Sequence, residues 1–324
     1  MPLTFDFPLE QLKTYQGITP RPADFDRFWD QSLAEMFTLD AQGKLAPAEF
    51  QAGFAECFHL YFTGVGGARV YAKLLRPKGV QKPHPAVLMF HGYSGNSGDW
   101  SDKLGYVGQG FTVAALDCRG QGGRSEDRSE VTRTTFHGHI IRGLEDALAG
   151  APEKLLFRNI FLDTAQLARI VMEMPEVDPQ RVGATGGSQG GALTVACAAL
   201  EPRIRRAAPV FPFLSDYKRV WEMDQAKDAY AELKDYFRLF DPGHKKEDAI
   251  FEKLGYIDIQ HLASRIRGQV LWSIGLMDTI CPPSSQFAAY NKITAPKAMS
   301  IYPDFGHEGL PGANDEIFQF LLGL

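Results

Sequence analysis

The sequence has little cysteine, no long apolar run and no basic stripe. Its four cysteines are spread over 324 residues without a C-x-x-C pair, so their spacing signals neither a zinc site nor a disulfide framework. No apolar run approaches the length of a membrane span. The N-terminus lacks the basic and apolar regions of a signal peptide. We therefore expect a reduced, cytoplasmic protein with no membrane partner.

The charge balance excludes another class of partner. The chain has 34 Lys and Arg against 39 Asp and Glu, for a net charge of −5. No basic stripe with interleaved aromatic residues recurs, so we expect no nucleic-acid partner. No pair of histidines with neighbouring acids forms a convincing metal site, so we predict no metal and no cofactor. With 44% hydrophobic and 23% charged residues, the composition is that of a soluble globular protein.

The most informative stretch is Gly186-Gly-Ser-Gln-Gly190, which fits the pattern G-x-S-x-G. A short apolar strand, 181–184, precedes it and a helical pattern, 192–200, follows it, as the nucleophile turn of α/β-hydrolases requires. The glycines allow strand and helix to approach closely. Ser188 is therefore the predicted nucleophile. The alternative is a glycine-rich turn that fits the pattern by chance.

The surrounding pattern predicts an α/β-hydrolase fold. A continuous apolar run, typical of a strand buried on both faces, occurs at 85–90, and further strands are predicted at 111–116, 206–211, 269–275 and 297–302. Helical patterns occur at 22–36, 99–109, 152–174 and 312–322. We expect one α/β domain over 1–324, with a mostly parallel, doubly wound sheet and an N-terminal antiparallel hairpin within 50–76. An N-terminal extension, 1–40, and a helical cap insertion, about 214–265, complete it. Such an insertion lies at the carboxyl ends of the strands, where ligands bind.

A serine nucleophile needs a base and an orienting acid, which follow it in the order acid, histidine in this fold. Asp278 follows the strand 269–275 and is the predicted acid, with Asp304 and Glu308 as rivals. His307 follows the last strand and is the predicted base. His91 is expected to pack and hydrogen-bond where an early strand ends. Four other histidines are expected on strand or cap surfaces: His59, His84, His244 and His261. His137 and His139 lie in the long loop and are weaker candidates for the base than His307.

The developing oxyanion needs two N–H donors. One is the backbone amide of Gln189, at the start of a helix, where the dipole favours negative charge. The other is assigned to Tyr93, in the glycine-flanked loop after the strand 85–90. Pro212 and Phe213, at the first residues of the cap, are the predicted substrate-binding residues. Together with Tyr93, Phe211 and Leu214 they should limit the acyl pocket to an acetyl group.

With these residues in place, the chain resembles carbohydrate esterase family seven, the acetyl xylan esterases and cephalosporin-C deacetylases. The motifs that carry the resemblance are Arg119-Gly-Gln121, Gly186-Gly-Ser-Gln-Gly190 and His307-Glu308, and the N-terminal stretches 8–17 and 21–29 resemble the family as well. The resemblance implies a triad of Ser188, Asp278 and His307, with oxyanion donors at Tyr93 and Gln189. It also implies deacetylation of short sugars and cephalosporins without metal or cofactor, and a ring-shaped homo-oligomer, commonly a hexamer. Arg119 is interpreted as structural.

Three other functions remain open at this point. A general short-chain carboxylesterase would share every motif. A peptidase of the oligopeptidase type would need a large additional domain, for which the hairpin region is too short. A catalytically inactive binding module on the same fold is disfavoured because all triad and oxyanion positions are intact.

Overall fold

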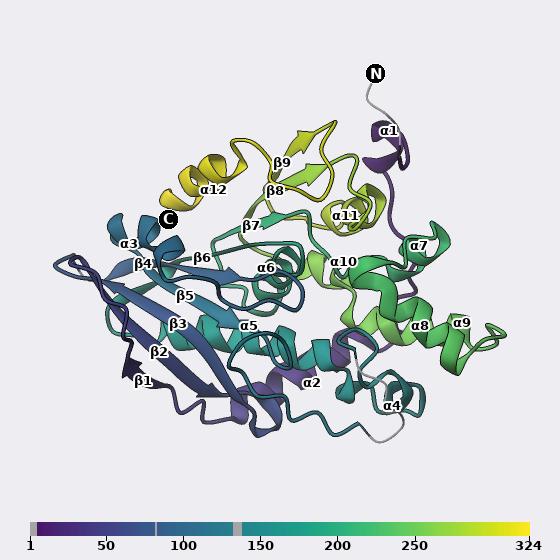
Figure 1. The fold of residues 1–324 in the computed structure, drawn as a ribbon, viewed down its shortest axis with the longest axis horizontal. Helices are drawn as coiled ribbons and strands as arrows, with labels where there is room; N and C mark the ends of the chain where they lie inside the picture. The colour runs from purple at the N-terminus through teal and green to yellow at the C-terminus, as the bar shows by residue number, and fades with distance from the viewer. Residues whose placement is uncertain (1–4, 82, 132–137) are drawn as a thin grey trace.

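The computed structural model describes residues 5–81, 83–131 and 138–324, and in this part of the chain the strands form one nine-stranded sheet. The strand order is β1-β2-β3-β5-β4-β6-β7-β8-β9 (Figure 1). The pairs β1–β2, β2–β3 and β3–β5 are antiparallel, and the pairs from β5–β4 across the sheet to β8–β9 are parallel. The strands are β1 (Lys44–Pro47), β2 (Ala55–Thr63), β3 (Arg69–Pro77), β4 (His84–Phe90), β5 (Thr112–Asp117), β6 (Val177–Gly187), β7 (Arg206–Val210), β8 (Gln269–Gly275) and β9 (Lys297–Tyr302).

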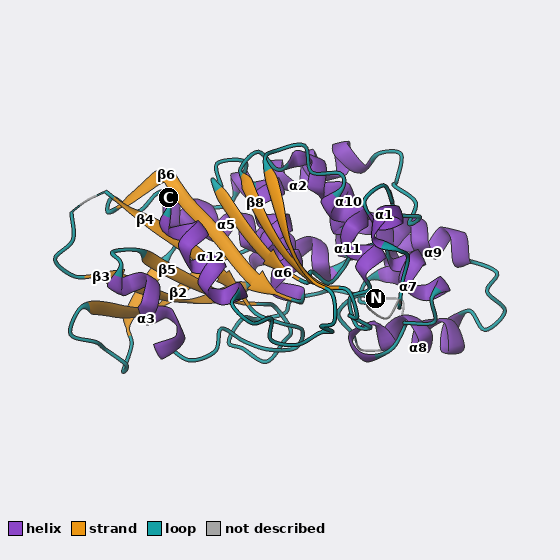
Figure 2. Cartoon of the chain, turned by 90° about the horizontal axis from the view of Figure 1, so that it is seen from above, coloured by secondary structure: helices purple, strands orange, loops and turns teal. Residues whose placement is uncertain are grey.

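Helices cover both faces of this sheet (Figure 2). One face packs against α2 (Phe25–Thr38), α5 (Leu156–Met172) and α6 (Gln189–Leu200), and the other against α3 (Leu104–Gly108) and α12 (Ala313–Leu322). Along β4, Leu88 belongs to the first core and Val87 to the second. Side chains of a strand alternate between faces, so burial on both sides requires the continuous apolar run seen in the sequence.

The predicted α/β-hydrolase fold is confirmed, with differences at several boundaries. Strand 206–211 ends one residue earlier than predicted, and the helix expected over 99–109 is shortened to α3, after a 3₁₀ turn at 101–103. Strand β1 was not predicted; it is an edge strand whose four residues are all exposed. It therefore has no buried face to impose an alternating pattern. Among the described helices, none combines the length and apolarity needed to cross a membrane.

The predicted cap lies between β7 and β8 in the chain, beyond the carboxyl ends of the central strands (Figures 1 and 2). Its helices are α7 (Tyr217–Glu222), α8 (Ala231–Phe240), α9 (Glu247–Leu254) and α10 (Ile259–Leu262). The remaining helices are α1 (Leu9–Leu12), α4 (Leu144–Leu148) and α11 (Pro283–Tyr290). Trp29 of α2 is fully buried, and its indole N–H donates to the Tyr256 carbonyl at 3.0 Å. The N-terminal extension thus shares a core with the cap.

A buried carboxyl group, Asp216, fastens the N-terminal segment to the cap, and a second one, Asp258, supports it from within the cap. Asp216 accepts hydrogen bonds from the Tyr15 hydroxyl at 2.8 Å and from two backbone N–H groups, those of Ile18 and Thr19. Asp258 caps α10 through the Gln260 N–H at 3.0 Å and accepts from the Asp216 N–H at 2.9 Å. Burial, reinforced by the charge of Asp216, raises the pKa of Asp258 to about 7.

This arrangement predicts a pH-dependent cost for Asp258→Asn. The variant has one acceptor oxygen instead of two, and its amide faces N–H donors, so the free energy of unfolding should fall by about 1–3 kcal/mol. In the native protein the folded pKa lies above the unfolded value of about 4. The folded state therefore retains a proton that the unfolded state has lost, and stability falls as pH rises from about 4 to about 7.

The variant has no such titration, so its cost relative to the native protein should be smaller at about pH 8 than at about pH 5. Urea unfolding of both proteins at the two pH values measures this difference. His261 titrates in both proteins and cancels in the comparison. An equal cost at both pH values would contradict the raised pKa of Asp258.

Candidate active site

The turn between β6 and α6 holds Ser188 in a strained backbone conformation, with φ 58° and ψ −120°. Its N–H donates to the Val210 carbonyl at 3.0 Å, which fixes the turn against the end of β7. A Cβ on Gly186 would lie 2.5 Å from the Phe90 carbonyl oxygen, and one on Gly190 would overlap the same oxygen. The close approach predicted for these glycines is confirmed. A positive φ in a serine is energetically costly. The turn that imposes it leaves Ser188 half-exposed at the carboxyl edge of the sheet.

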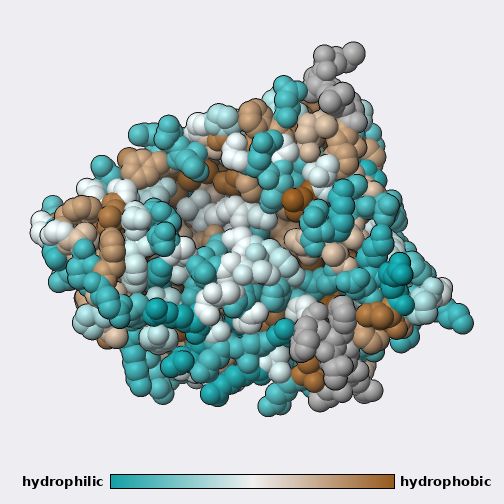
Figure 3. Space-filling view, in the orientation of Figure 1, coloured by the Kyte–Doolittle hydropathy of each residue, from teal (hydrophilic) through white to brown (hydrophobic). Residues whose placement is uncertain are grey.

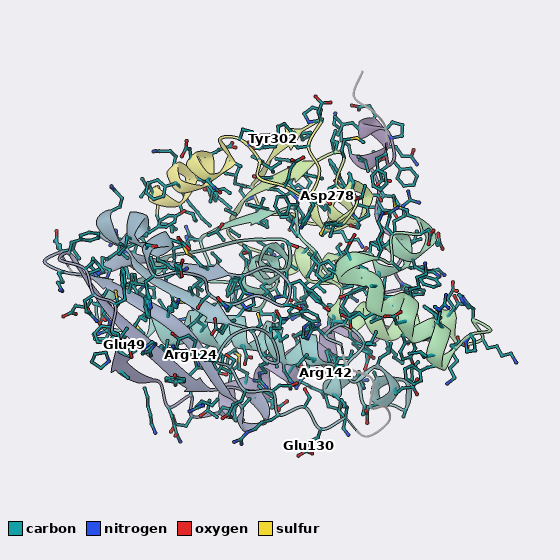
Figure 4. All side chains as sticks on the ribbon, in the orientation of Figure 1. Glu49, Arg124, Glu130, Arg142, Asp278 and Tyr302 are labelled. Carbon is teal, nitrogen blue, oxygen red and sulfur yellow. The ribbon has the colours of Figure 1, made fainter. Side chains whose placement is uncertain are left out.

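Asp278 and His307, 29 residues apart, meet at this edge. Asp278 follows β8 near the start of α11 (Figure 4), is fully buried, and lies with Oδ2 at 2.8 Å from His307 Nδ1. Its other oxygen accepts the N–H groups of Ile280 at 2.9 Å and Cys281 at 2.8 Å. These donors hold the carboxylate still, so it can fix the orientation of the His307 ring and leave Nε2 free for chemistry.

Two neighbours join this pair to the serine. The rings of Phe211 and His307 lie 4.4 Å apart between centroids, and Phe211 follows the strand end to which Ser188 is bonded. The buried Cys281 thiol contacts Ser188, while burial raises its pKa. Its sulfur lies within 4.8 Å of ligand atoms of both Asp278 and His307. No Ser188–His307 hydrogen bond occurs among the described residues, and in unliganded hydrolases this contact is often loose.

The rival acids do not reach the base. Asp304 and Glu308 are exposed, and Glu308 accepts the Gly306 N–H at 3.1 Å instead. Of the other histidines, His244 is exposed as expected, but the prediction was wrong for three, because packing buries them: His59, His84 and His261. His137 lies outside the described residues, and His139 packs against Tyr93.

The loop after β4, residues 91–95, is called the oxyanion loop from here on. His91 braces it, as expected: Nδ1 lies 2.7 Å from the Gly92 carbonyl, and Nε2 accepts the Cys118 N–H at 3.0 Å. Burial lowers the pKa of His91, which favours the neutral ring that this pair of bonds needs. Among the described residues, no acceptor takes up the backbone N–H of Tyr93 or that of Gln189.

Gln121, Gln189 and Arg119, which belong to the sequence motifs, form hydrogen bonds and an ion pair with other side chains of the protein. The amides of Gln189 and Gln121 bond to each other reciprocally, at 2.8 and 2.9 Å. Arg119 forms a two-pronged ion pair with Asp163 of α5, at 2.6 and 2.7 Å, and donates to the Val65 carbonyl at 2.7 Å. Arg119 thus ties the end of β5 to a helix and to the β2–β3 turn. Its partners are a carboxylate and a backbone carbonyl, which agrees with the prediction that Arg119 has a structural role.

The predicted substrate-binding residues lie next to the serine but are covered. The Phe213 N–H donates to the Ser188 carbonyl at 3.0 Å, and its ring packs between those of Tyr93 and Tyr230. Phe213 has no exposed surface, and Pro212 is buried as well. Their contact with substrate remains a prediction.

Asp278, Cys281 and His307 also offer one oxygen, one sulfur and one nitrogen close enough to hold a metal ion. However, Asp278 and His307 already bond to each other at 2.8 Å, and burial raises the pKa of the Cys281 thiol. A metal needs the thiolate and would have to displace the bond between acid and base. The group therefore fits acid–base chemistry better than metal binding. Cys281 was not predicted to lie at this site, because no motif in the sequence links it to Ser188.

Comparison with known proteins agrees with this geometry. A family model described as acetyl xylan esterase matches residues 1–324. The chain is 57% identical to acetyl xylan esterase 1 from Thermoanaerobacterium sp. JW/SL YS485, with TM-score 0.95 over 98% of this chain and 99% of that one. It is 34% identical to an acetyl xylan esterase from Paenibacillus sp. R4, with TM-score 0.92 and the same coverage.

A more distant curated relative is the acetyl esterase Axe7A of Xylanibacter ruminicola. The two are 26% identical over 304 residues, which is 92% of this chain, and the match spans 65% of that relative's length. Since the family model and the solved structures match almost all of the sequence, the chain belongs to the acetyl xylan esterase family, within the α/β-hydrolase fold.

Proposed function

We propose that this protein is a serine esterase that removes acetyl groups from small O-acetylated substrates. The observation that carries the proposal is the buried Asp278 carboxylate bonded to His307 at 2.8 Å, beside the strained turn of Ser188. In such an arrangement the carboxylate orients the imidazole, and the imidazole acts as the base that activates the serine hydroxyl as a nucleophile. Family membership supports the acetyl ester as substrate.

In the proposed reaction, Ser188 Oγ attacks the acetyl carbonyl carbon while His307 Nε2 takes the hydroxyl proton. The N–H groups of Gln189 and Tyr93 stabilise the oxyanion. The bond from the carbonyl carbon to the alcohol oxygen then breaks, and His307 returns the proton to the leaving alcohol. Water, activated by His307, attacks the acetyl-serine and releases acetate and free Ser188. Asp278 keeps His307 in the required tautomer and stabilises its protonated form.

The proposed substrates are acetylated xylo-oligosaccharides, with cephalosporin C as a second acetyl ester. The relatives whose names say acetyl xylan esterase support the first. On the face drawn in Figure 3, the coloured hydrophobic areas are small and broken up by hydrophilic ones. In its described part, the face in Figure 3 therefore shows no broad, continuous apolar area of the kind that a lipase presents to lipid.

We expect specificity to be strict for the acyl group and loose for the alcohol. Phe213, whose N–H bonds to the Ser188 carbonyl, is fully buried, as is Leu214. If these residues limit the acyl pocket as predicted, each added methylene should cost about 1–3 kcal/mol in transition-state binding. kcat/KM should therefore fall sharply from acetyl to butyryl esters of one alcohol and change little across acetyl esters of different alcohols. A matched kinetic panel measures both series. Equal or better turnover of octanoyl esters would favour a general carboxylesterase instead.

A homo-oligomer, with a hexamer implied by the resemblance, and a cytoplasmic location remain predictions. Light scattering on the purified protein measures the assembly. Fractionation of the source cells measures the location.

A further inference from the structure

Glu232, on cap helix α8, is a buried carboxylate with an unusual set of partners. Glu232 is 9% exposed. One oxygen accepts the Tyr93 hydroxyl, and the other accepts the N–H groups of His139 at 2.9 Å and Ile141 at 3.0 Å. Among the described residues, no Lys or Arg forms an ion pair with Glu232, and burial raises its pKa. Burying a carboxylate is costly unless its acceptor sites are used, and here three donors use them.

Tyr93 is the point where this carboxylate meets the oxyanion loop. The Tyr93 ring packs edge-on against Phe213 at 5.4 Å and against His139 at 5.0 Å between centroids. The ring contacts on two sides and the hydrogen bond to Glu232 restrict the orientation of the Tyr93 side chain. A fixed side chain also fixes the backbone that carries it, and the proposed oxyanion donor is the backbone N–H of the same residue.

The contact joins segments far apart in the chain. Tyr93 and Glu232 are separated by 139 residues, one in the loop after β4 and the other in the cap. Gly138 lies against the carboxylate, where a Cβ would overlap Glu232 Oε2. The cap, the segment 138–141 and the oxyanion loop therefore converge on one carboxylate.

We propose that Glu232 is a positioning residue, which holds the Tyr93 N–H at the oxyanion site through the Tyr93 hydroxyl. The proposal rests on the proposed esterase function. A donor aimed at the oxyanion acts in the transition state far more than in the bound substrate. Loosening it should lower kcat and leave KM nearly unchanged.

The test compares Tyr93→Phe, Glu232→Gln and the double variant on one acetyl ester. Loss of a whole oxyanion donor costs about 10²–10³ in kcat, and a displaced donor should cost less. Both single variants should lose about 10–100-fold in kcat, with KM within about twofold of the native value. Because they break the same contact, the double variant should be no slower than the slower single variant.

Tyr236→Phe is the matched control. Tyr236 lies on the same helix, is 1% exposed, and donates its hydroxyl to the Glu145 carboxylate of α4. Its loss removes a contact of the same kind without touching the oxyanion loop. It should lower the melting temperature and leave kcat unchanged.

Native kcat in both Tyr93→Phe and Glu232→Gln would overturn the proposal, and so would an equal fall in kcat in Tyr236→Phe. If Glu232→Gln does not fold, Tyr93→Phe decides alone, because it leaves the carboxylate in place. A native enzyme inactive on every acetyl ester would instead overturn the proposed function, an outcome distinct from those of the variants.

Discussion

Ser188→Ala should abolish acetyl-ester hydrolysis and leave the protein folded. Removing the nucleophile of a serine triad costs about 10⁶-fold in kcat. The remaining rate, about 10³–10⁴-fold over water, comes from the oxyanion donors and from binding. The turn itself is held by backbone contacts, the Ser188 N–H to the Val210 carbonyl and the Phe213 N–H to the Ser188 carbonyl. Alanine retains both, so the melting temperature should stay close to the native value.

A fluorophosphonate probe gives an independent reading of the same site. It should label the native protein at Ser188 and leave Ser188→Ala unlabelled, with circular dichroism showing that both are folded. Near-native turnover in the variant would refute the nucleophile assignment. A folded native protein that neither reacts with the probe nor turns over acetyl esters would point to the inactive binding module.

Asp278→Asn should lower kcat by about 10⁴, the effect of replacing the acid of such a triad. An asparagine can keep one oxygen on the N–H groups of Ile280 and Cys281. Its NH₂ would then face His307 Nδ1 as a donor. The ring would have to accept there and carry its proton on Nε2, where it cannot take the proton of Ser188. The loss should appear in kcat measured on a saturating acetyl ester.

Asp304→Asn is the control for this assignment. Asp304 lies three residues before His307 and was a rival for the acid, but it is exposed. Its substitution removes the same charge from the same end of the sheet without altering the buried pair. It should change kcat by no more than about twofold, since screened surface charges contribute little. A larger loss in Asp304→Asn than in Asp278→Asn would refute the assignment of the acid.

Local features of the sequence were sufficient to predict most strands of the sheet and to place Ser188, Asp278 and His307 at the ends of strands. The predicted strands 269–275 and 297–302 coincide with β8 and β9, and the continuous apolar run 85–90 lies in β4, which is buried on both faces. Gly186 and Gly190 are forced by contacts within a few residues of Ser188 and with the adjacent strand. The places of Asp278 and His307 follow from strand order, since the carboxyl ends of parallel strands meet at one edge.

The sequence could not predict which side chains the cap brings to this edge. Glu232 lies in a charged, amphipathic helix, where a glutamate is ordinarily solvated, and nothing within α8 distinguishes it from its neighbours. The edge strand β1 was not predicted because all its residues are exposed, so no buried face imposes an alternating pattern on its sequence. The burial of His59, His84 and His261 likewise depends on elements distant in the sequence.

The sequence by itself determined the architecture, the strained serine turn and the places of Asp278 and His307 after two late strands. Each depends on backbone geometry over a few residues or on the topology of a parallel sheet. Only the tertiary structure decided that Glu232 would face Tyr93 across 139 residues, that Cys281 would lie beside Ser188, and that Asp216 would tie the N-terminal segment to the cap. Those contacts are set by how the cap and the extension dock on the sheet. Docking depends on the summed packing of many side chains, which no local pattern encodes.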